Sequence, residues 1–293
     1  MSLKYGIICV MKMLVAVVAM SALGSALGGF PVKPRACYEA TFRARVVAGP
    51  NVEDFPQLVD LVPMCVSRPT VTGERFAAVQ WKFLDAAGRQ IPRPHEGASP
   101  QTLFSREWRS YRYRFWTPEN AATVDFFPIN SAKANKAELD SVDVREVAPD
   151  GPLNFNADFS AADDAAWGWQ LVGTAAFQNI AHGKSAINTM DGHLNGDLFP
   201  VKGGGNVKVE AVCSNPVIIG SRYSSASVRI MFYGKFADAA KKGSRGLVEP
   251  PVSPAGKHAT ATHVFRVPDG MCWARVTAWH GMVERISVTE EKR

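Results

Sequence analysis

The feature that most constrains the fold is an internal repeat, in which the second half of the chain reproduces the pattern of the first at an offset of 144 to 150 residues. Three pairs of segments match: residues 79–83 with 228–232, 115–120 with 265–270, and 139–146 with 283–290. In the last pair, LDSVDVRE and VERISVTE place apolar and acidic positions in the same order. Such a period is typical of a duplicated domain and too long for a solenoid repeat. A chain of 293 residues also has the length of two domains.

Each copy consists of short segments in which apolar and polar side chains alternate, as in residues 37–47 and 78–85. A period of two predicts strands, and further strands are expected at residues 111–116, 122–127 and 139–147. Residues 235–242 have room for only two helical turns, less than a stable helix needs. A hydrophobic content of 46% with 24 Gly and 19 Pro excludes a disordered or collagen-like chain. The expected fold class is all-β, with two tandem antiparallel β-sandwich (jelly-roll) domains.

Residues 1–28 have the pattern of a secretory signal peptide. An apolar run follows Lys4 and Lys12 and ends in small residues, and both Ala22 with Gly24 and Ala26 with Gly28 offer small side chains at the two positions that signal peptidase reads. The run is short for a membrane span, although an uncleaved anchor is the alternative. The first module is then expected at 29–148 and the second at 149–293, with a secreted location that is extracellular, periplasmic or at the cell surface.

The net charge falls from +6 to +4 when the two lysines of the signal peptide are removed. The remaining Lys and Arg residues are dispersed, which argues against a nucleic-acid partner. An acidic glycan stays possible, and no membrane partner is expected after cleavage.

Four cysteines remain after the signal peptide takes Cys9 with it, and an even number in an exported chain permits disulfides. Three pairings are possible. The pairing that keeps each bridge within one module, Cys37–Cys65 with Cys213–Cys272, is preferred. No C-x-x-C motif is present, so zinc and thioredoxin-type chemistry have no support.

Both halves resemble the β-sandwich carbohydrate-binding modules often called family 4/9-like, which are galactose-binding-like domains. The resemblance rests on an opening segment before a tryptophan (154–159, then Trp167 and Trp169), a middle strand (38–46), a strand and turn (81–88) and a closing strand (139–146). It implies a jelly roll that binds a polysaccharide or other glycan. Few residues precede Cys37 in the first copy, so its opening strands are expected to be short or missing.

The resemblance also implies a structural calcium ion near the opening and closing segments, while no other cofactor is expected. Its candidate ligands are Asp158 and Glu284 in the second copy and Asp140 in the first, because calcium prefers hard oxygen ligands. Solvated carboxylates at the sheet edge are the alternative.

Alternation in the strand after Pro268 separates a core face from an outer face. Cys272, Ala274, Val276 and Ala278 share the apolar face, while the residues between them share the other face. Together with the outward residues of the strand 228–233, they form a candidate glycan platform: Arg229, Tyr233, Trp273, Arg275, Thr277 and Trp279. Indole rings can contact the C–H faces of sugars, and guanidinium and hydroxyl groups can bind sugar oxygens.

Alternatives to this platform stay open. A strand tryptophan also packs under loops or against a neighbouring domain, and Trp167 and Trp169 are either core plugs or loop contacts. Trp81, Tyr111, Tyr113 and Phe115 are expected in the first core.

No catalytic motif is recognised, so the predicted function is a secreted, non-enzymatic carbohydrate-binding protein. A cell-surface structural or adhesion module is the alternative, and a jelly-roll polysaccharide lyase or hydrolase is a further one.

Overall fold

The computed structural model describes residues 29–48, 77–94, 101–103, 105–129, 136–161, 167–173, 176–180, 184–188, 192–214, 227–240, 259–279 and 281–291. The proposed signal peptide and Cys65 lie outside these ranges. Within them the chain forms strands and one short 3-10 helix, η3 (Phe236–Ala240), where the sequence allows only two helical turns. No helix of this described part is long and apolar enough to cross a membrane.

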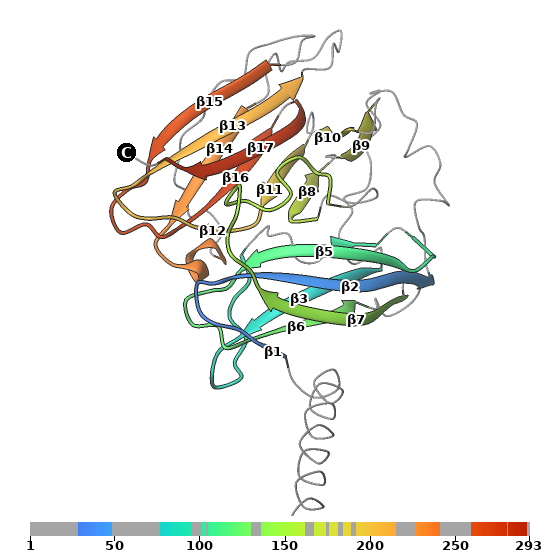
Figure 1. Ribbon diagram of the computed structural model, residues 1–293. Coiled ribbons are helices and arrows are strands. Elements are labelled where there is room, and N and C mark those ends of the chain that lie inside the picture. Colours follow the sequence, from blue (N-terminus) through green and yellow to red (C-terminus); the bar gives the residue numbers. More distant parts are fainter. Residues whose placement is uncertain are drawn as a thin grey trace, which may run out of the picture.

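The first half forms one antiparallel β-sandwich, seen in the lower part of Figure 1. A four-stranded sheet has the order β1-β6-β3-β4 and a three-stranded sheet has the order β5-β2-β7. The strands are β1 (Phe30–Pro31), β2 (Cys37–Ala48), β3 (Ala78–Leu84), β4 (Gln101–Thr102), β5 (Arg109–Trp116), β6 (Thr123–Ile129) and β7 (Lys136–Glu146).

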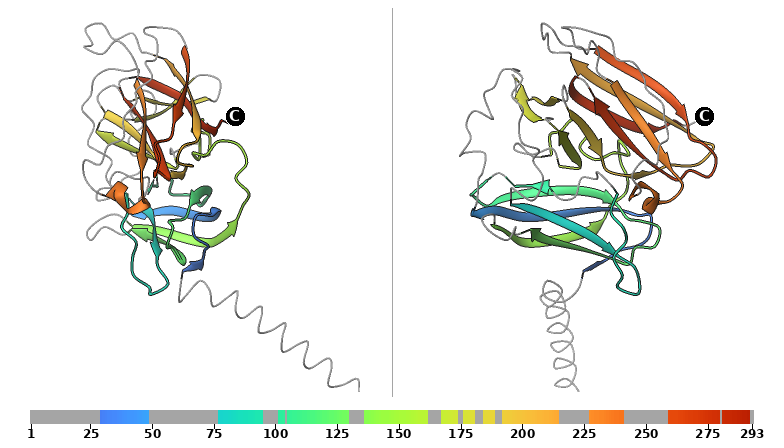
Figure 2. Two further views of the ribbon diagram at one scale, coloured as in Figure 1. Left: turned by 90° about the vertical axis from the view of Figure 1, so that its left-hand side faces the viewer. Right: turned by 180° about the vertical axis from the view of Figure 1, so that it is seen from behind.

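The second half forms a larger sandwich, in the upper part of Figure 1 and, seen from behind, in the upper part of the right-hand view of Figure 2. One sheet has the order β15-β13-β17-β10-β9, and the other has the order β12-β16-β11-β8 with β14 also paired to β16. The strands are β8 (Trp169–Gly173), β9 (Ala176–Ile180), β10 (Lys184–Asn188), β11 (Gly192–Gly196), β12 (Phe199–Pro200), β13 (Asn206–Ser214), β14 (Ser227–Tyr233), β15 (Ala259–Arg266), β16 (Trp273–Trp279) and β17 (Met282–Glu290). The predicted all-β fold of two tandem sandwiches is confirmed.

The strand pairing shows the duplication directly. The order β5-β2-β7 in the first module recurs as β15-β13-β17 in the second, and the pair β3–β6 recurs as β14–β16. The segment pairs matched in the sequence are β3 with β14, the turn after β5 with the turn after β15, and β7 with β17. Counterparts of β8 to β11 are absent from the described part of the first module, as expected from its short opening.

A further repeat escaped the sequence comparison because its offset differs from the others. The tetrapeptide FPVK occurs at residues 30–33 and again at 199–202. Its first two residues form β1 on β6 and β12 on β16, and its valine continues the contact: Val32 N donates to Ala122 O at 2.9 Å and Val201 N donates to Cys272 O at 3.0 Å. The same short edge strand therefore closes the equivalent sheet in both modules.

Two hydrophobic cores correspond to the two sandwiches, but the first core also contains residues of the second half, among them Trp167 and Trp273. Trp169 is buried in the second core, whereas Trp167, two positions earlier, is buried in the first. Gly168 between them has a φ of 87°, a conformation that favours glycine. This turn points the two indoles into different cores. Trp167 therefore contributes to the core of the first module, while Trp169 contributes to the core of the second.

The predicted disulfide between Cys213 and Cys272 is wrong: both cysteines are free thiols. Cys272 is hydrogen-bonded to Val201, which precedes β13 in the chain. Cys213 lies near the far end of β13, about 23 Å from the first residue of that strand, Asn206, at ~3.3 Å per residue. Bridged cysteines need Cα atoms about 4.4–6.8 Å apart. The Cys272 thiol instead donates to Gly234 O at 2.7 Å. Cys37 is also a free thiol, which contradicts its predicted bridge to Cys65, a residue outside the described part of the chain.

Candidate functional site

The predicted platform residues share one face of the sheet formed by β8, β11, β16 and β14. Antiparallel register places Arg229 opposite Thr277, Thr277 opposite Asn195, and Asn195 opposite Gln170. Trp279 lies opposite Ser227 on β14 and His193 on β11. Because directly opposed residues share a face, these side chains form two adjacent rows across four strands.

The opposite face of the same sheet is the apolar core that alternation predicted. Ala274, Val276 and Ala278 are fully buried in the second core, together with Val228 and Ile230 from β14. The outward-pointing residues are therefore assigned to the correct face of the strands, although several of them are not accessible to solvent.

Four of the six platform residues are buried, which corrects the expectation that they form an open surface. Relative exposure is 0% for Trp273 and Thr277, 3% for Tyr233 and 6% for Arg275. Tyr233 donates its hydroxyl to Met231 Sδ at 3.7 Å, and the Arg275 guanidinium lies 5.7 Å from the centre of the Tyr233 ring.

Trp273 packs against the first module, one of the alternatives that the sequence left open. Its Nε1–H donates to Glu119 Oε2 at 3.1 Å, and its ring meets Phe236 edge-on at 5.3 Å. Glu119 also accepts from the backbone N–H of Phe236 at 3.2 Å. This indole belongs to the contact between modules, which removes one of the two rings from the predicted platform.

Trp279 and Arg229 stay partly exposed and form a stack with a residue that the sequence did not indicate. The imidazole of His193 stacks on Trp279 at 4.2 Å with an interplanar angle of 16°. The Arg229 guanidinium lies 5.2 Å from the centre of the same indole. Since β16 lies between β11 and β14, the three side chains form a row across three strands, here called the Trp279 stack.

Polar side chains lie next to the Trp279 stack on the same face. Thr277 Oγ1 accepts from Trp279 Nε1 at 3.3 Å, and Asn195 and Gln170 continue that row. Gln170 Oε1 and Ser227 Oγ are buried atoms without a hydrogen-bond partner in the described structure. Buried polar atoms are normally satisfied by protein, water or ligand, so this face has capacity for further hydrogen bonds.

Sequence reasoning missed His193, Asn195 and Gln170 because their strands are short. Residues 192–196 read GHLNG, which gives a turn-like signal rather than clear alternation. Only the pairing of β11 with β16 places these residues beside Trp279.

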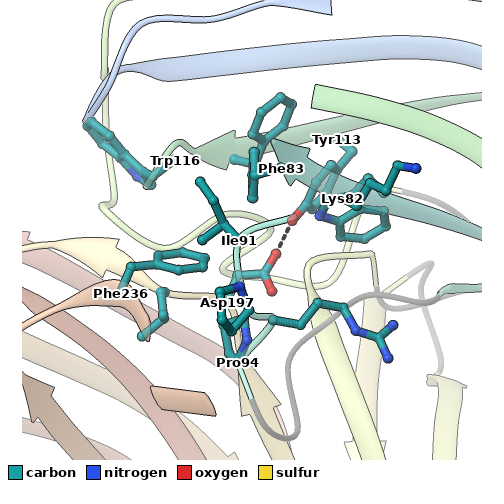
Figure 3. Close-up of a pocket in the computed structure, with 13 residues that line it drawn as sticks. Lys82, Phe83, Ile91, Pro94, Tyr113, Trp116, Asp197 and Phe236 are labelled. Atoms are coloured by element: carbon teal, nitrogen blue, oxygen red, sulfur yellow. Dashed lines mark hydrogen bonds between the residues drawn. The ribbon is translucent and has the colours of Figure 1, made fainter. Parts of the chain in front are cut away.

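A separate cavity lies where the two modules meet, close to the first core (Figure 3). It measures about 40 Å³ and is lined from both modules, by residues that include Trp81, Tyr113, Asp197 and Phe236. The Tyr113 hydroxyl donates to Asp197 Oδ2. Burial and, secondly, the neighbouring carboxylate raise the pKa of Tyr113 well above its ordinary value, so the phenol stays protonated and donates.

The carboxylates suggested for calcium do not form part of a group of three or more candidate metal ligands among the described residues. Asp158 is exposed and accepts from Ser160 Oγ at 2.7 Å, while Asp140 lies in the first module at 3.9 Å from Arg43. Glu284 lies in β17 of the second module, beside Cys213. Among the described residues, no group of three or more His, Cys, Asp or Glu side chains has a geometry that could hold a metal ion.

No protein-family model and no curated protein matches this sequence. Solved structures similar to the chain include carbohydrate-binding modules, the class that the sequence resembles. The N-terminal CBM22-1–CBM22-2 tandem domain of Paenibacillus barcinonensis Xyn10C is 15% identical, with 89% of this chain and 80% of that one covered and a TM-score of 0.34.

Two other similar structures cover one half of this chain or less. The C-terminal CBM6 of the Zobellia galactanivorans laminarinase LamC is 12% identical, with 41% of this chain and 98% of that one covered and a TM-score of 0.28. The enzymatically active domain of tailspike protein 4 from bacteriophage CBA120 is also 12% identical, with coverage of 50% and 22% and a TM-score of 0.32. At these TM-scores, similarity assigns neither a family nor a ligand to this chain.

Proposed function

We propose that this chain is a secreted, non-catalytic protein that binds a glycan on the β8-β11-β16-β14 face of its second module. The observation that carries the proposal is the partly exposed Trp279 stack, next to a row of amide and hydroxyl side chains. Secretion rests on the signal-like sequence at residues 1–28, and the proposed modules span residues 29–148 and 149–293.

The chemistry of this face suits sugar hydroxyls. The edge of an aromatic ring carries partial positive charge, and a guanidinium offers several donors in a fixed plane. Gln170 is partly exposed and adds an amide that both donates and accepts, whereas Thr277 and Asn195 in the same row are buried. In this proposal Trp279 and Arg229 contact the ligand, and the buried Thr277 holds the Trp279 indole in position by accepting from its Nε1–H. The buried Arg275 packs against the Tyr233 ring on the same face.

The burial of Trp273 favours a second candidate, a structural or adhesion module that binds no sugar. In that reading the aromatic residues of β14 and β16 stabilise contacts between modules, as Trp273 does with Glu119 and Phe236. Catalysis has weaker support, because Tyr233, the base that a lyase mechanism would require, is buried and bonded to Met231.

The experiment is affinity electrophoresis of the purified protein in gels that contain neutral or acidic polysaccharides. Trp279→Ala should weaken the binding free energy by about 1–3 kcal/mol, by analogy with bases stacked on aromatic rings, and so reduce retention. Arg229→Gln should also reduce retention. Trp108→Ala is the matched control. That partly exposed indole lies in the first module, 4.8 Å from the guanidinium of Arg45, and its removal should leave retention unchanged.

The outcome separates the two candidates. Retention that is lost in Trp279→Ala and kept in Trp108→Ala supports glycan binding at the second module. If the unmodified protein is not retained by any polysaccharide, the glycan proposal fails and the structural module is favoured.

A further inference from the structure

The cavity between the modules differs in chemistry from the Trp279 stack. Six of its lining residues are aromatic: Trp81, Phe83, Tyr113, Phe115, Trp116 and Phe236. Five of them come from β3 and β5 of the first module, and Phe236 comes from η3 of the second. Figure 3 shows the carboxylate of Asp197 among these rings, joined to the hydroxyl of Tyr113.

Among the described residues that line the cavity, Asp197 supplies the carboxylate, and Lys82 and Arg93 are the cationic residues. Lys82 contributes to the lining, but its ammonium lies 3.5 Å from Asp125 Oδ2 and 5.4 Å from the centre of the Phe127 ring. Trp81 and Phe83, its neighbours in β3, are buried in the first core, so the Lys82 side chain leaves the strand on the opposite face. Arg93 is exposed to solvent.

Size and polarity argue against an oligosaccharide in this cavity. Among the described residues, no Ser, Thr, Asn or Gln lines it, and this part of the lining offers few of the dispersed amide and hydroxyl partners that several sugar hydroxyls require. One water needs about 10–15 Å³ by this measure of volume. A cavity of about 40 Å³ therefore accommodates a few waters or one compact ligand group.

We propose that the cavity between the modules binds an organic ammonium group, with Asp197 as its counter-ion and the surrounding rings as its walls. Aromatic faces attract cations through their quadrupole, and enclosed aromatic sites recognise methylated ammonium ions in this way. A carboxylate adds direct charge attraction in a site that is partly shielded from water. The ligand bridges the modules, because Asp197 and Phe236 belong to the second module and the other rings to the first.

The test is isothermal titration calorimetry of the purified protein with choline chloride. The matched probe is 3,3-dimethyl-1-butanol, which has the shape of choline but a carbon in place of the charged nitrogen. We expect choline to bind at least tenfold more tightly than the neutral alcohol. A second arm replaces choline by phosphatidylcholine vesicles in a sedimentation assay, which distinguishes a soluble amine from a lipid headgroup.

Two variants locate the site. Asp197→Asn keeps an oxygen that accepts from Tyr113 but removes the charge, and we expect it to weaken choline binding at least tenfold. Phe236→Leu should weaken binding several-fold, whereas Phe265→Leu, which alters a ring of the second core outside the cavity, should not.

Several results overturn the proposal. It fails if choline gives no binding heat at 10 mM ligand, if the neutral alcohol binds equally well, or if both Asp197→Asn and Phe236→Leu bind choline as the unmodified protein does. Circular dichroism establishes that each variant is folded. Where one variant is unfolded, the other variant and the alcohol comparison still decide the result.

Discussion

Replacement of Trp167 by Ala tests whether the two modules share a core. Trp167 is fully buried, and its ring lies 5.0 Å from Tyr111, 5.3 Å from Phe42 and 6.4 Å from Trp81. All three partners belong to the first module, although Trp167 is numbered within the second. We therefore expect this substitution to destabilise the module that does not contain it.

The magnitude follows from packing alone. Truncation of a buried Trp to Ala costs about 3–5 kcal/mol. Trp167 Nε1 has no hydrogen-bond partner in the described structure, so no hydrogen bond is lost with the ring. At about 2–4 °C per kcal/mol for a chain of this size, Tm should fall by roughly 6–20 °C. Trp167→Phe keeps most of the apolar ring and should cost clearly less.

Hydrogen–deuterium exchange with mass spectrometry supplies the location of the effect. Trp167→Ala should raise exchange in β2, β3 and β5, which contribute the partners of this ring. Trp169→Ala is the matched comparison, and it should raise exchange first in β11, β13 and β16 of the second module. Thermal melts by circular dichroism give the overall loss of stability.

The shared core is refuted by either of two results. One is a Tm for Trp167→Ala within about 2 °C of that of the unmodified protein, which corresponds to a cost of no more than about 1 kcal/mol. The other is increased exchange confined to the second module.

Two other predictions concern the contact between modules and the thiols. Glu119→Ala should destabilise the protein by about 1–3 kcal/mol, because it removes a charged acceptor from the N–H groups of Trp273 and Phe236; equal urea midpoints for variant and parent would contradict this. Burial raises the pKa of Cys37 to about 11 and of Cys213 to about 12, so both thiols should resist a disulfide reagent at pH 8 until urea unfolds the protein. Cys272 is a partly exposed free thiol, so the labelled positions are mapped by mass spectrometry, and rapid labelling of Cys37 or Cys213 in the native protein would refute the assignment.

Much of the architecture could be predicted because it depends on local pattern. Strict alternation located β2, β3 and β5, since side chains on a strand point to opposite faces. The repeat gave the two modules, because equivalent strands carry equivalent patterns. Inward placement of Trp81, Tyr113 and Val276 also followed from alternation and is confirmed by their burial.

The exposure of outward residues could not be predicted, because alternation gives the face of a strand but not what covers that face. Trp273 and Trp279 have the same pattern in β16, yet the first is fully buried beside Glu119 and the second stays partly exposed. The cysteine pairing failed for a related reason, since spacing along the chain does not report the distance between Cys213 and Cys272 in space.

The strands with clear alternation, their inner faces and the duplication follow from the sequence alone, because each depends on neighbouring residues or on a repeated pattern. Tertiary structure decided where the modules meet. Side chains two apart on a strand share a face, which would place Trp167 and Trp169 in one core, but the positive φ of Gly168 separates them. Strand pairing across long stretches of sequence likewise brought His193 to Trp279 and Asp197 to Tyr113, contacts that no local pattern encodes.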